Sequence, residues 1–257
     1  MKSTKKSPTS VRRAEPTRHP GIRPVAVDEP YINILVYGDP GVGKTVLAGT
    51  SPNCLLLESA MDGSESAAIQ GSKAEKWKMR DWNDMTEAYE YLRHEKHGYD
   101  WVWLDSITLF QELGLDMIME DLVAVKPHRS LFLPDRGEYG ENMRRLSMWV
   151  RNMKPLDFNF GIIAHAMRYE DEEGRELLWP AIQGVNMPQK ICGYMGVVGY
   201  LTVRRKEAKD ERMLLTNKTA KYYAKDRFDA LGGRLTNPTI PMIQELVAKK
   251  LPTRKGA

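Results

Sequence analysis

The sequence predicts an α/β fold built on a mostly parallel, doubly wound sheet, with antiparallel strands added at its C-terminal edge. Two observations support this prediction. Between residues 31 and 165, short apolar runs typical of buried parallel strands alternate with apolar residues at helical spacing. Later segments are joined by short polar turns, which indicates antiparallel strands. A chain of 257 residues is long enough for one core of this kind.

The first third of the chain predicts three strands. Residues 31–37 are β-branched and aromatic, and this run ends at Gly38. A glycine-rich corner follows it and leads into a short helix that Pro52 prevents from extending. Residues 54–59, CLLLES, predict a second buried strand, and residues 75–82 contain a short third one.

The middle of the chain continues the alternation. Apolar residues at helical spacing predict a helix that starts at Asn83 or Thr86 and runs to His97. Residues 101–106, WVWLDS, predict the next strand, and a helical run then continues to about Val123.

A loop containing proline and arginine, a helix and another strand follow. The helix is predicted over residues 141–154, which place five apolar side chains on one face. The strand is predicted over residues 158–165, FNFGIIAH.

The last third of the chain predicts antiparallel structure. Residues 168–180 predict a hairpin that turns at Glu173–Gly174. Residues 196–205 and 212–218 predict two strands joined by a polar connection, and residues 240–250 predict a closing helix.

The charge distribution suggests three parts: a flexible basic arm at residues 1–28, one folded domain at residues 29–250, and a basic tail at residues 251–257. The net charge is +4, and residues 1–24 contain seven Lys or Arg side chains against one Glu. The arm is polar, rich in proline and nearly free of large apolar residues, so it cannot offset its own ordering entropy. Electrostatic contact with nucleic acid and simple solubilisation remain alternative roles for it.

Two further features bear on the compartment. Cys54 and Cys192 lie far apart in apolar surroundings, which indicates buried thiols in a reducing cytoplasm. The N-terminus has no apolar signal region, and no later run approaches the roughly 18 apolar residues that a membrane helix needs. We therefore expect a soluble, cytoplasmic protein without a membrane partner.

The glycine-rich corner fits the pattern G-x-x-x-x-G-K-[ST]. Glycines lack Cβ and let successive backbone N–H groups point into one concavity, to which the following helix adds its positive dipole end. Lys44 is placed to reach the β- and γ-phosphates of a nucleotide, and the Thr45 hydroxyl to hold Mg²⁺. The residues predicted to hold the nucleotide are Gly38, Asp39, Pro40, Gly41, Val42, Gly43, Lys44, Thr45 and Val46.

Asp105 is the predicted second acidic site, because it ends an apolar strand where a carboxylate can accept from the waters of Mg²⁺. Two predicted strands separate the glycine loop from Asp105, an arrangement that suits ATPases with a separate carboxylate to activate water. Ser106 follows Asp105, so the adjacent acidic pair of many ring ATPases is missing. An ordinary cap at the strand end is the alternative.

Six segments in this order carry a resemblance: GDPGVGKT, LLLES, YDWVWLDSIT, EYG, GIIAHAMR and AKDRF. They resemble phage-encoded nucleotide-binding proteins of the RecA-like P-loop NTPase superfamily, some of which are single-strand annealing recombinases related to RecA and archaeal RadB. The similarity covers about residues 31–235. It implies a RecA-like ATPase domain, ATP with Mg²⁺ as cofactors, a homo-oligomer and single-stranded DNA as partner.

The resemblance also implies roles for individual residues. Gly38, Gly43, Lys44 and Thr45 would lie on the triphosphate and Asp105 on the metal. Glu58 ends the second strand, where relatives have an acidic residue that orients the attacking water. In RecA this residue lies slightly beyond the strand, so Asp62 and Glu65 are alternatives.

His165 matches a polar residue that touches the γ-phosphate in RecA-like proteins and links it to a DNA-binding loop, here residues 166–184. Lys225 and Arg227 match a basic pair that reaches the ATP site of the neighbouring subunit. A solvated basic turn is the alternative for this pair. The candidate DNA contacts, for which surface ion pairs are the alternative, are His128, Arg129, Arg136 and Arg168.

The leading functional hypothesis is an ATP-dependent recombinase that binds single-stranded DNA, in a ring or filament with ATP sites at subunit interfaces. A single-strand-binding protein is a further candidate partner, and the host cytoplasm is the expected compartment. Two alternatives stay open: a hexameric DNA helicase or motor, and a nucleotide-gated assembly protein with little turnover.

Overall fold

A single ten-stranded sheet organises the part of the chain that the computed structural model describes, which is residues 31–59, 63–170, 174, 176–206 and 209–251. The strands are β1 (Asn33–Gly38), β2 (Cys54–Ser59), β3 (Glu75–Met79), β4 (Trp101–Asp105), β5 (Asn159–Glu170), β6 (Glu176–Pro180), β7 (Val197–Lys206), β8 (Lys209–Leu215), β9 (Lys225–Asp226) and β10 (Arg234–Thr236).

The strand order is β10–β8–β7–β1–β5–β4–β2–β3, with β6 paired to β5 and β9 paired to β7. Parallel pairing runs without interruption from β7 through β1, β5, β4 and β2 to β3. The strands β6, β8, β9 and β10 pair antiparallel with their neighbours. The predicted fold class, a mostly parallel sheet with antiparallel strands added from the C-terminal part of the chain, is confirmed.

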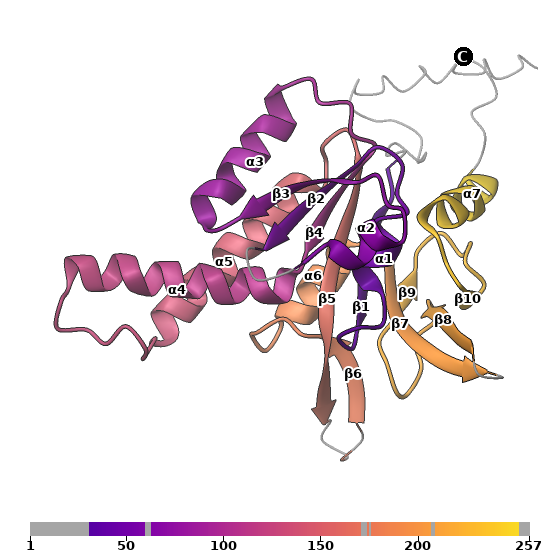
Figure 1. The fold of residues 1–257 in the computed structure, drawn as a ribbon. Coiled ribbons are helices and arrows are strands. Elements are labelled where there is room, and N and C mark those ends of the chain that lie inside the picture. Colours follow the sequence, from indigo (N-terminus) through magenta and orange to yellow (C-terminus); the bar gives the residue numbers. More distant parts are fainter. Residues whose placement is uncertain (1–30, 60–62, 171–173, 175, 207–208, 252–257) are drawn as a thin grey trace, which may run out of the picture.

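Helices cover both faces of the sheet (Figure 1). They are α1 (Lys44–Ala48), α2 (Glu65–Ile69), α3 (Trp82–His94), α4 (Ile107–Val125), α5 (Arg136–Met153), α6 (Met187–Tyr194) and α7 (Ile240–Lys250). One apolar core contains side chains of α3, α5 and α6, and the other contains side chains of α1 and α7. Because side chains alternate along a strand, β1 sends Leu35 and Tyr37 into the first core and Ile34 and Val36 into the second.

The central strand is also tied to the late segments of the chain. The Tyr37 hydroxyl lies 2.6 Å from the carbonyl oxygen of Tyr223 and 3.1 Å from that of Leu178. Burial raises the pKa of Tyr37 far above its ordinary value, so the hydroxyl keeps its proton as a donor. The strand before the glycine loop is therefore fixed from the side of β6.

Helix starts were predicted less well than strands. The prediction that Asn83 or Thr86 caps the third helix is wrong, because the Asp81 carboxylate accepts from the backbone N–H groups of Asn83 and Asp84 at 2.8 and 2.9 Å. That helix also ends at His94, before the predicted His97.

The helix predicted over residues 141–154 begins earlier, at Arg136. Asp135 and Glu138 form a capping box there, in which the Glu138 carboxylate accepts from the Asp135 N–H at 2.6 Å. The short elements α2, α6, β9 and β10 were not predicted.

The predicted hairpins are confirmed. β5 and β6 pair antiparallel from Ala166–Pro180 to Glu170–Glu176, although Glu173 of the predicted turn lies outside the described residues. β7 and β8 also pair antiparallel, and their pairing extends to Lys206 opposite Lys209, so the connection is shorter than predicted.

Three compositional predictions meet the structure unevenly. Both cysteines are free and buried, as expected. The predicted basic arm, residues 1–28, and all of the tail at residues 251–257 except Leu251 lie outside the described residues. Among the helices that the structure describes, none combines the length and the apolar character needed to cross a bilayer.

We predict that Gly161→Ala destabilises the fold. Gly161 on β5 lies opposite Trp103 on β4, and an added Cβ would lie 2.1 Å from Cδ2 of this indole. Trp103 cannot easily move, because it is fully buried, stacks on Trp101 and donates to the Ser51 hydroxyl at 2.9 Å. Overpacking of this kind costs about 1–3 kcal/mol, measurable as a lower midpoint of urea denaturation.

Gly193→Ala is the matched control, because Gly193 is exposed in α6 and an added Cβ would meet open space. Alanine favours the helix by about 0.5–1 kcal/mol relative to glycine, so this variant should be as stable as the wild type or more stable. Equal midpoints for the two variants would show that the Gly161–Trp103 contact does not constrain the sheet.

Candidate nucleotide site

The corner between β1 and α1 has a conformation that requires glycine. Gly41 and Gly43 have φ angles of 79° and 94°, in the left-handed region that side chains with a Cβ disfavour. At Gly38 an added Cβ would lie 2.3 Å from the carbonyl oxygen of Leu201 on β7. The loop therefore packs directly against the sheet and turns tightly before α1, as the sequence pattern predicted.

Lys44 is folded back over this loop. The residue is only 7% exposed, and its Nζ donates to the carbonyl oxygens of Gly38 and Asp39 at 3.0 and 2.9 Å. These carbonyls belong to the start of the glycine loop, so the ammonium group is hydrogen-bonded to the loop itself.

Asp105 and Thr45 meet although they are 60 residues apart in sequence. The Thr45 hydroxyl donates to Oδ2 of Asp105 at 2.7 Å, and Asp105 is 5% exposed. The peptide bond between Asp105 and Ser106 is cis. A hydroxyl and a carboxylate oxygen in contact are the hard ligands that Mg²⁺ prefers, so the donor set fits the predicted metal.

A cavity of about 310 Å³ opens beside this pair. It brings together eight of the predicted site residues, among them Lys44, Thr45, Asp105 and His165, and adds the charged residue Arg212 of β8, which sequence reasoning missed. Its lining residues are Pro40, Gly41, Gly43, Lys44, Thr45, Val46, Gly63, Ser66, Gln70, Asp105, His165 and Arg212.

His165 connects this cavity to the segment after β6. On β5 its Cα pairs with Gly38, the last residue of β1. Its backbone N–H donates to the Thr108 hydroxyl at 3.1 Å, and its carbonyl accepts from the Ala181 N–H at 2.8 Å. The Thr108 hydroxyl in turn donates to the Ala181 carbonyl at 2.9 Å. One side chain at the start of α4 thus joins the strand of the cavity to the end of the hairpin.

Glu58 is a register neighbour of Asp105 across β2 and β4, but it does not line the cavity. It is 1% exposed, and its Oε2 lies 3.4 Å from Nζ of Lys76, which donates to the Ser64 hydroxyl. Among the described residues its carboxylate accepts no hydrogen bond.

The alternatives to Glu58 differ in position. Glu65 is exposed in the first turn of α2, and Asp62 lies outside the described residues. The choice of a water-activating residue among Glu58, Asp62 and Glu65 stays a prediction.

Lys225 and Arg227 lie at the C-terminal end of α6 in their own chain. Lys225 Nζ donates to the carbonyls of Cys192 and Met195 at 3.1 and 2.8 Å. Burial lowers the pKa of Lys225, and the charge of Arg227 adds to this effect. Arg227 is exposed and makes a longer contact of 3.4 Å with the Gly193 carbonyl. Neither lines the cavity, so their predicted role in a neighbouring subunit stays a prediction.

The four candidate DNA contacts fall into two groups. Arg129 forms an ion pair with Asp135 at 2.9 Å, and Arg168 forms one with Glu176 at 3.4 Å. These two arginines fit the alternative of surface ion pairs. The two exposed candidates outside these pairs are His128 and Arg136.

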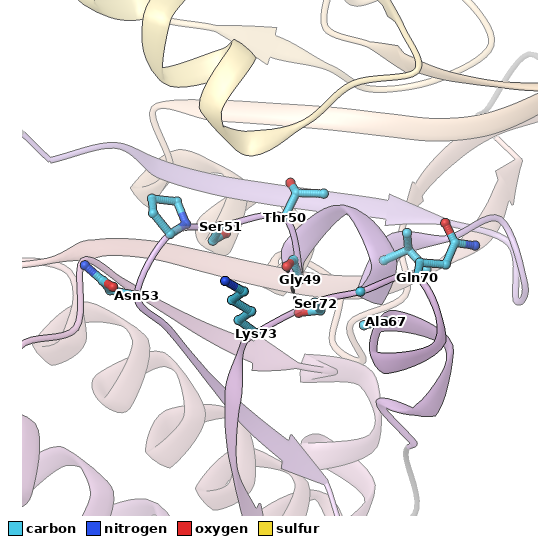
Figure 2. A pocket seen from close by; sticks show the side chains of 11 residues that line it. Gly49, Thr50, Ser51, Asn53, Ala67, Gln70, Ser72 and Lys73 are labelled. Atoms are coloured by element: carbon cyan, nitrogen blue, oxygen red, sulfur yellow. Dashed lines mark hydrogen bonds between the residues drawn. The ribbon is translucent and has the colours of Figure 1, made fainter.

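A second cavity of about 470 Å³ lies at the C-terminal end of α1 and shares Val46 and Gln70 with the first. Figure 2 shows Ser72 beside Gly49, to whose carbonyl its hydroxyl donates at 2.7 Å. Among the described residues in its lining, Lys73 is the one that carries a charge. The charged groups that suit phosphate and metal therefore belong to the smaller cavity. The second cavity is lined by Val46, Gly49, Thr50, Ser51, Pro52, Asn53, Ala67, Gln70, Gly71, Ser72 and Lys73.

Three features define the class of P-loop NTPases. They are the glycine loop, the contact between Thr45 and Asp105, and the position of β5 between β1 and β4. Within that class, residues 31–228 match the AAA domain family AAA_24, and the chain belongs to this family. No curated protein sequence matches the chain.

Similar solved structures include three with low sequence identity. The RadB recombinase is 13% identical with a TM-score of 0.42, over 72% of this chain and 79% of that one. A KaiC-like protein from Pyrococcus horikoshii OT3 is 14% identical with a TM-score of 0.35, over 72% and 77% of the two chains. The flagellar accessory protein FlaH from Methanocaldococcus jannaschii is 7% identical with a TM-score of 0.38, over 80% and 84%.

We predict that Asp105→Asn weakens the use of Mg²⁺ and leaves the glycine loop intact. Asparagine keeps an oxygen that can accept from Thr45, but it removes the charge that favours a divalent cation. The Mg²⁺ concentration for half-maximal ATP binding should rise on the order of tenfold, equivalent to about 1.4 kcal/mol. Binding without Mg²⁺ should not weaken, because no anion-binding group is lost.

The measurement is a titration with a fluorescent ATP analogue at several Mg²⁺ concentrations. Asp116→Asn is the control, because Asp116 is an exposed carboxylate on α4, outside the cavity. An unchanged Mg²⁺ requirement in Asp105→Asn would exclude Asp105 as a metal ligand.

Proposed function

We propose that the protein is a Mg²⁺-dependent ATPase that binds single-stranded DNA and promotes annealing or recombination. The observation that carries the nucleotide part is the contact between Thr45 and Asp105 beside Lys44 in one cavity. When bound, Mg²⁺ neutralises phosphate charge and holds ordered water. Thr45 and Asp105 would hold this ion.

Lys44 supplies the mobile positive charge. Its ammonium now donates to two neutral carbonyls, of Gly38 and Asp39. Negatively charged phosphate oxygens attract an ammonium more strongly than neutral carbonyl oxygens do, so phosphate would replace these partners favourably. Lys44 would then supply one positive charge to the phosphates, in addition to the charge of Mg²⁺.

The DNA part of the proposal rests on the connection from His165 to the β5–β6 hairpin. β5 continues from His165 to Glu170 and pairs there with β6, which places the hairpin away from the central sheet (Figure 1). A displacement of His165 would reach this hairpin through Thr108 and Ala181, which are hydrogen-bonded to it and to each other. We assign residues 166–184 to the DNA surface on this basis.

The second proposed DNA segment connects α4 and α5, which extend together away from the sheet (Figure 1). Phe132 in this connection is 85% exposed, and His128 and Arg136 are exposed near it. Exposed aromatic rings stack on bases without sequence preference, while positively charged side chains attract the phosphate backbone of DNA. The combination supports binding to single strands that tolerates sequence.

The burial of Glu58 favours a second candidate, a nucleotide-gated assembly protein with little turnover. Within the described residues, Asp105 is the one carboxylate that lines the cavity of Lys44, which we call the phosphate cavity. Glu58 is buried outside it. A site without a carboxylate next to the attacking water binds ATP and hydrolyses it slowly.

We predict that the wild-type protein hydrolyses ATP faster with single-stranded DNA than without it, and that it anneals complementary strands. Lys44→Ala should lose about two orders of magnitude in ATP affinity, since it removes the charged donor among the phosphates. Lys73→Ala, which removes an exposed lysine of the second cavity, is the control and should bind as the wild type does.

Three assays separate the candidates: ATP hydrolysis with and without DNA, strand annealing, and strand unwinding. Unwinding would favour a motor, and ATP-dependent DNA binding without turnover would favour the assembly protein. Native hydrolysis by Lys44→Ala would overturn the assignment of the site.

We further propose that the active form is an oligomer in which Arg227 acts on the neighbouring subunit's ATP. Arg227→Ala should bind ATP through its own loop but lose hydrolysis and ATP-dependent assembly, because a positioned cation stabilises charge that develops on the γ-phosphate. Mixing it with Lys44→Ala should restore part of the activity at interfaces where an intact loop meets an intact arginine.

Hydrolysis and light scattering over a range of protein concentrations provide the measurement. The matched control is Lys221→Ala, which removes an exposed cation of the same segment. A fully active Arg227→Ala protein would disprove the shared site.

A further inference from the structure

We propose that Arg212 is a second cation, supplied by the same chain as the glycine loop, for the phosphates of the bound nucleotide. This inference rests on the proposed function, because it requires that a nucleotide binds in the cavity of Lys44. It differs from the roles discussed for Lys225 and Arg227, which would act on a neighbouring subunit.

Contacts with the loop place Arg212 there. Its Nε donates to the Val42 carbonyl at 3.2 Å. A Cβ added to Gly43 would lie only 2.4 Å from this Nε. The guanidinium group therefore lies directly against the glycine loop, and Arg212 lines the same cavity as Lys44 and Asp105.

The strand β8 aims the side chain at the loop. Arg212 and Leu214 lie two residues apart and therefore project from the same face of β8. Leu214 packs in the core that contains Leu47 of α1, the helix that follows the glycine loop. Arg212 therefore projects from the face of the sheet on which α1 packs.

The backbone at Arg212 is held by a reciprocal pair of hydrogen bonds with Asn237. The Arg212 N–H donates to the Asn237 side-chain oxygen at 3.0 Å, and the Asn237 N–H donates to the Arg212 carbonyl at 2.7 Å. These two hydrogen bonds fix the backbone from which the Arg212 side chain projects.

The hydrogen bonding of Arg212 suits an anion. A guanidinium carries five N–H donors, and within the described residues the contact with Val42 is its one side-chain hydrogen bond. No carboxylate of the described residues forms an ion pair with it. Planar guanidinium groups bind phosphate oxygens with two parallel hydrogen bonds, so phosphate is the chemistry that Arg212 fits.

The position in the sheet indicates which phosphates are involved. β8 lies two strands from β1 on one side, and β4 with Asp105 lies two strands from it on the other. Thr45 and Asp105 mark the metal side, where the γ-phosphate is expected. Arg212 instead touches Val42 and Gly43, in the part of the loop whose backbone cradles the α- and β-phosphates. The geometry therefore points to the phosphates that ADP and ATP share.

The test compares the binding of ADP and ATP by calorimetry in the full chain. Arg212→Gln keeps two of the three side-chain methylene groups and a polar end but removes the charge, and it should weaken the binding of both nucleotides by a similar factor of about tenfold or more. Arg212→Lys keeps the charge without the planar fork and should give an intermediate loss. Arg234→Ala removes an exposed arginine from β10 at the same sheet edge and should change neither affinity more than about twofold.

Urea denaturation of each variant separates lost binding from lost folding. If Arg212→Gln bound ADP and ATP each as tightly as the wild type does, the role of Arg212 would be overturned and the proposed function would stand. A loss confined to ATP would overturn the assignment of Arg212 to the phosphates that ADP and ATP share, because the γ-phosphate would then be its partner. If the wild-type chain bound neither nucleotide, the proposed function would fall and this inference with it.

Discussion

The pairing of β5 between β1 and β4 is the constraint on which the candidate site depends. Neighbouring strands lie about 4.8 Å apart, so the end of β4 is roughly 10 Å from the end of β1. The glycine loop crosses this distance and brings Thr45 to Asp105 at 2.7 Å. The same insertion places His165 of β5 between the loop and the carboxylate. One feature of sheet order thus assembles the metal pair and a third polar residue that is hydrogen-bonded, through its backbone, to the outer hairpin.

Two lysines illustrate how similar contacts lead to different functions. Lys44 and Lys225 each donate to two backbone carbonyls, but those of Lys44 belong to the loop that lines the cavity. Moving Lys225 towards a neighbouring subunit would leave the Met195 carbonyl without this donor, at a cost of about 1–3 kcal/mol, whereas the Cys192 carbonyl would still accept from the Met195 N–H. Arg227 is exposed, and within the described residues its side chain makes one hydrogen bond, of 3.4 Å, so its movement costs less. Of the predicted basic pair, Arg227 is the residue that the structure leaves better able to reach another chain.

Local sequence signals predicted the parts of the fold and site that are local. The glycine loop is contiguous, and Asp105 ends an apolar run, so pattern and position were enough for both. The site residue that was missed, Arg212, has no such signal. Its alternation with Leu214 gives the face of β8, but its distance from the loop depends on β8 pairing with β7 beside β1, about 170 residues after Val42. The start of α5 was missed for a different reason, because glycines at 137 and 140 weaken the helical pattern that the capping box at Asp135 restores.

The charges at the strand ends and in the cavity fit the proposed Mg²⁺. Glu58 and Asp105 are register partners on the same face of neighbouring strands, so their carboxylates would repel each other. Lys76 lies beside Glu58, and the Thr45 hydroxyl donates to Asp105. In the phosphate cavity, Lys44 and Arg212 contribute two positive charges and Asp105 one negative charge, which leaves a net of +1 if His165 is neutral. A triphosphate carries several negative charges, so these side chains alone do not balance it. The oxygens of Thr45 and Asp105 lie where a divalent cation would supply the missing charge, opposite the side of the loop on which Arg212 stands.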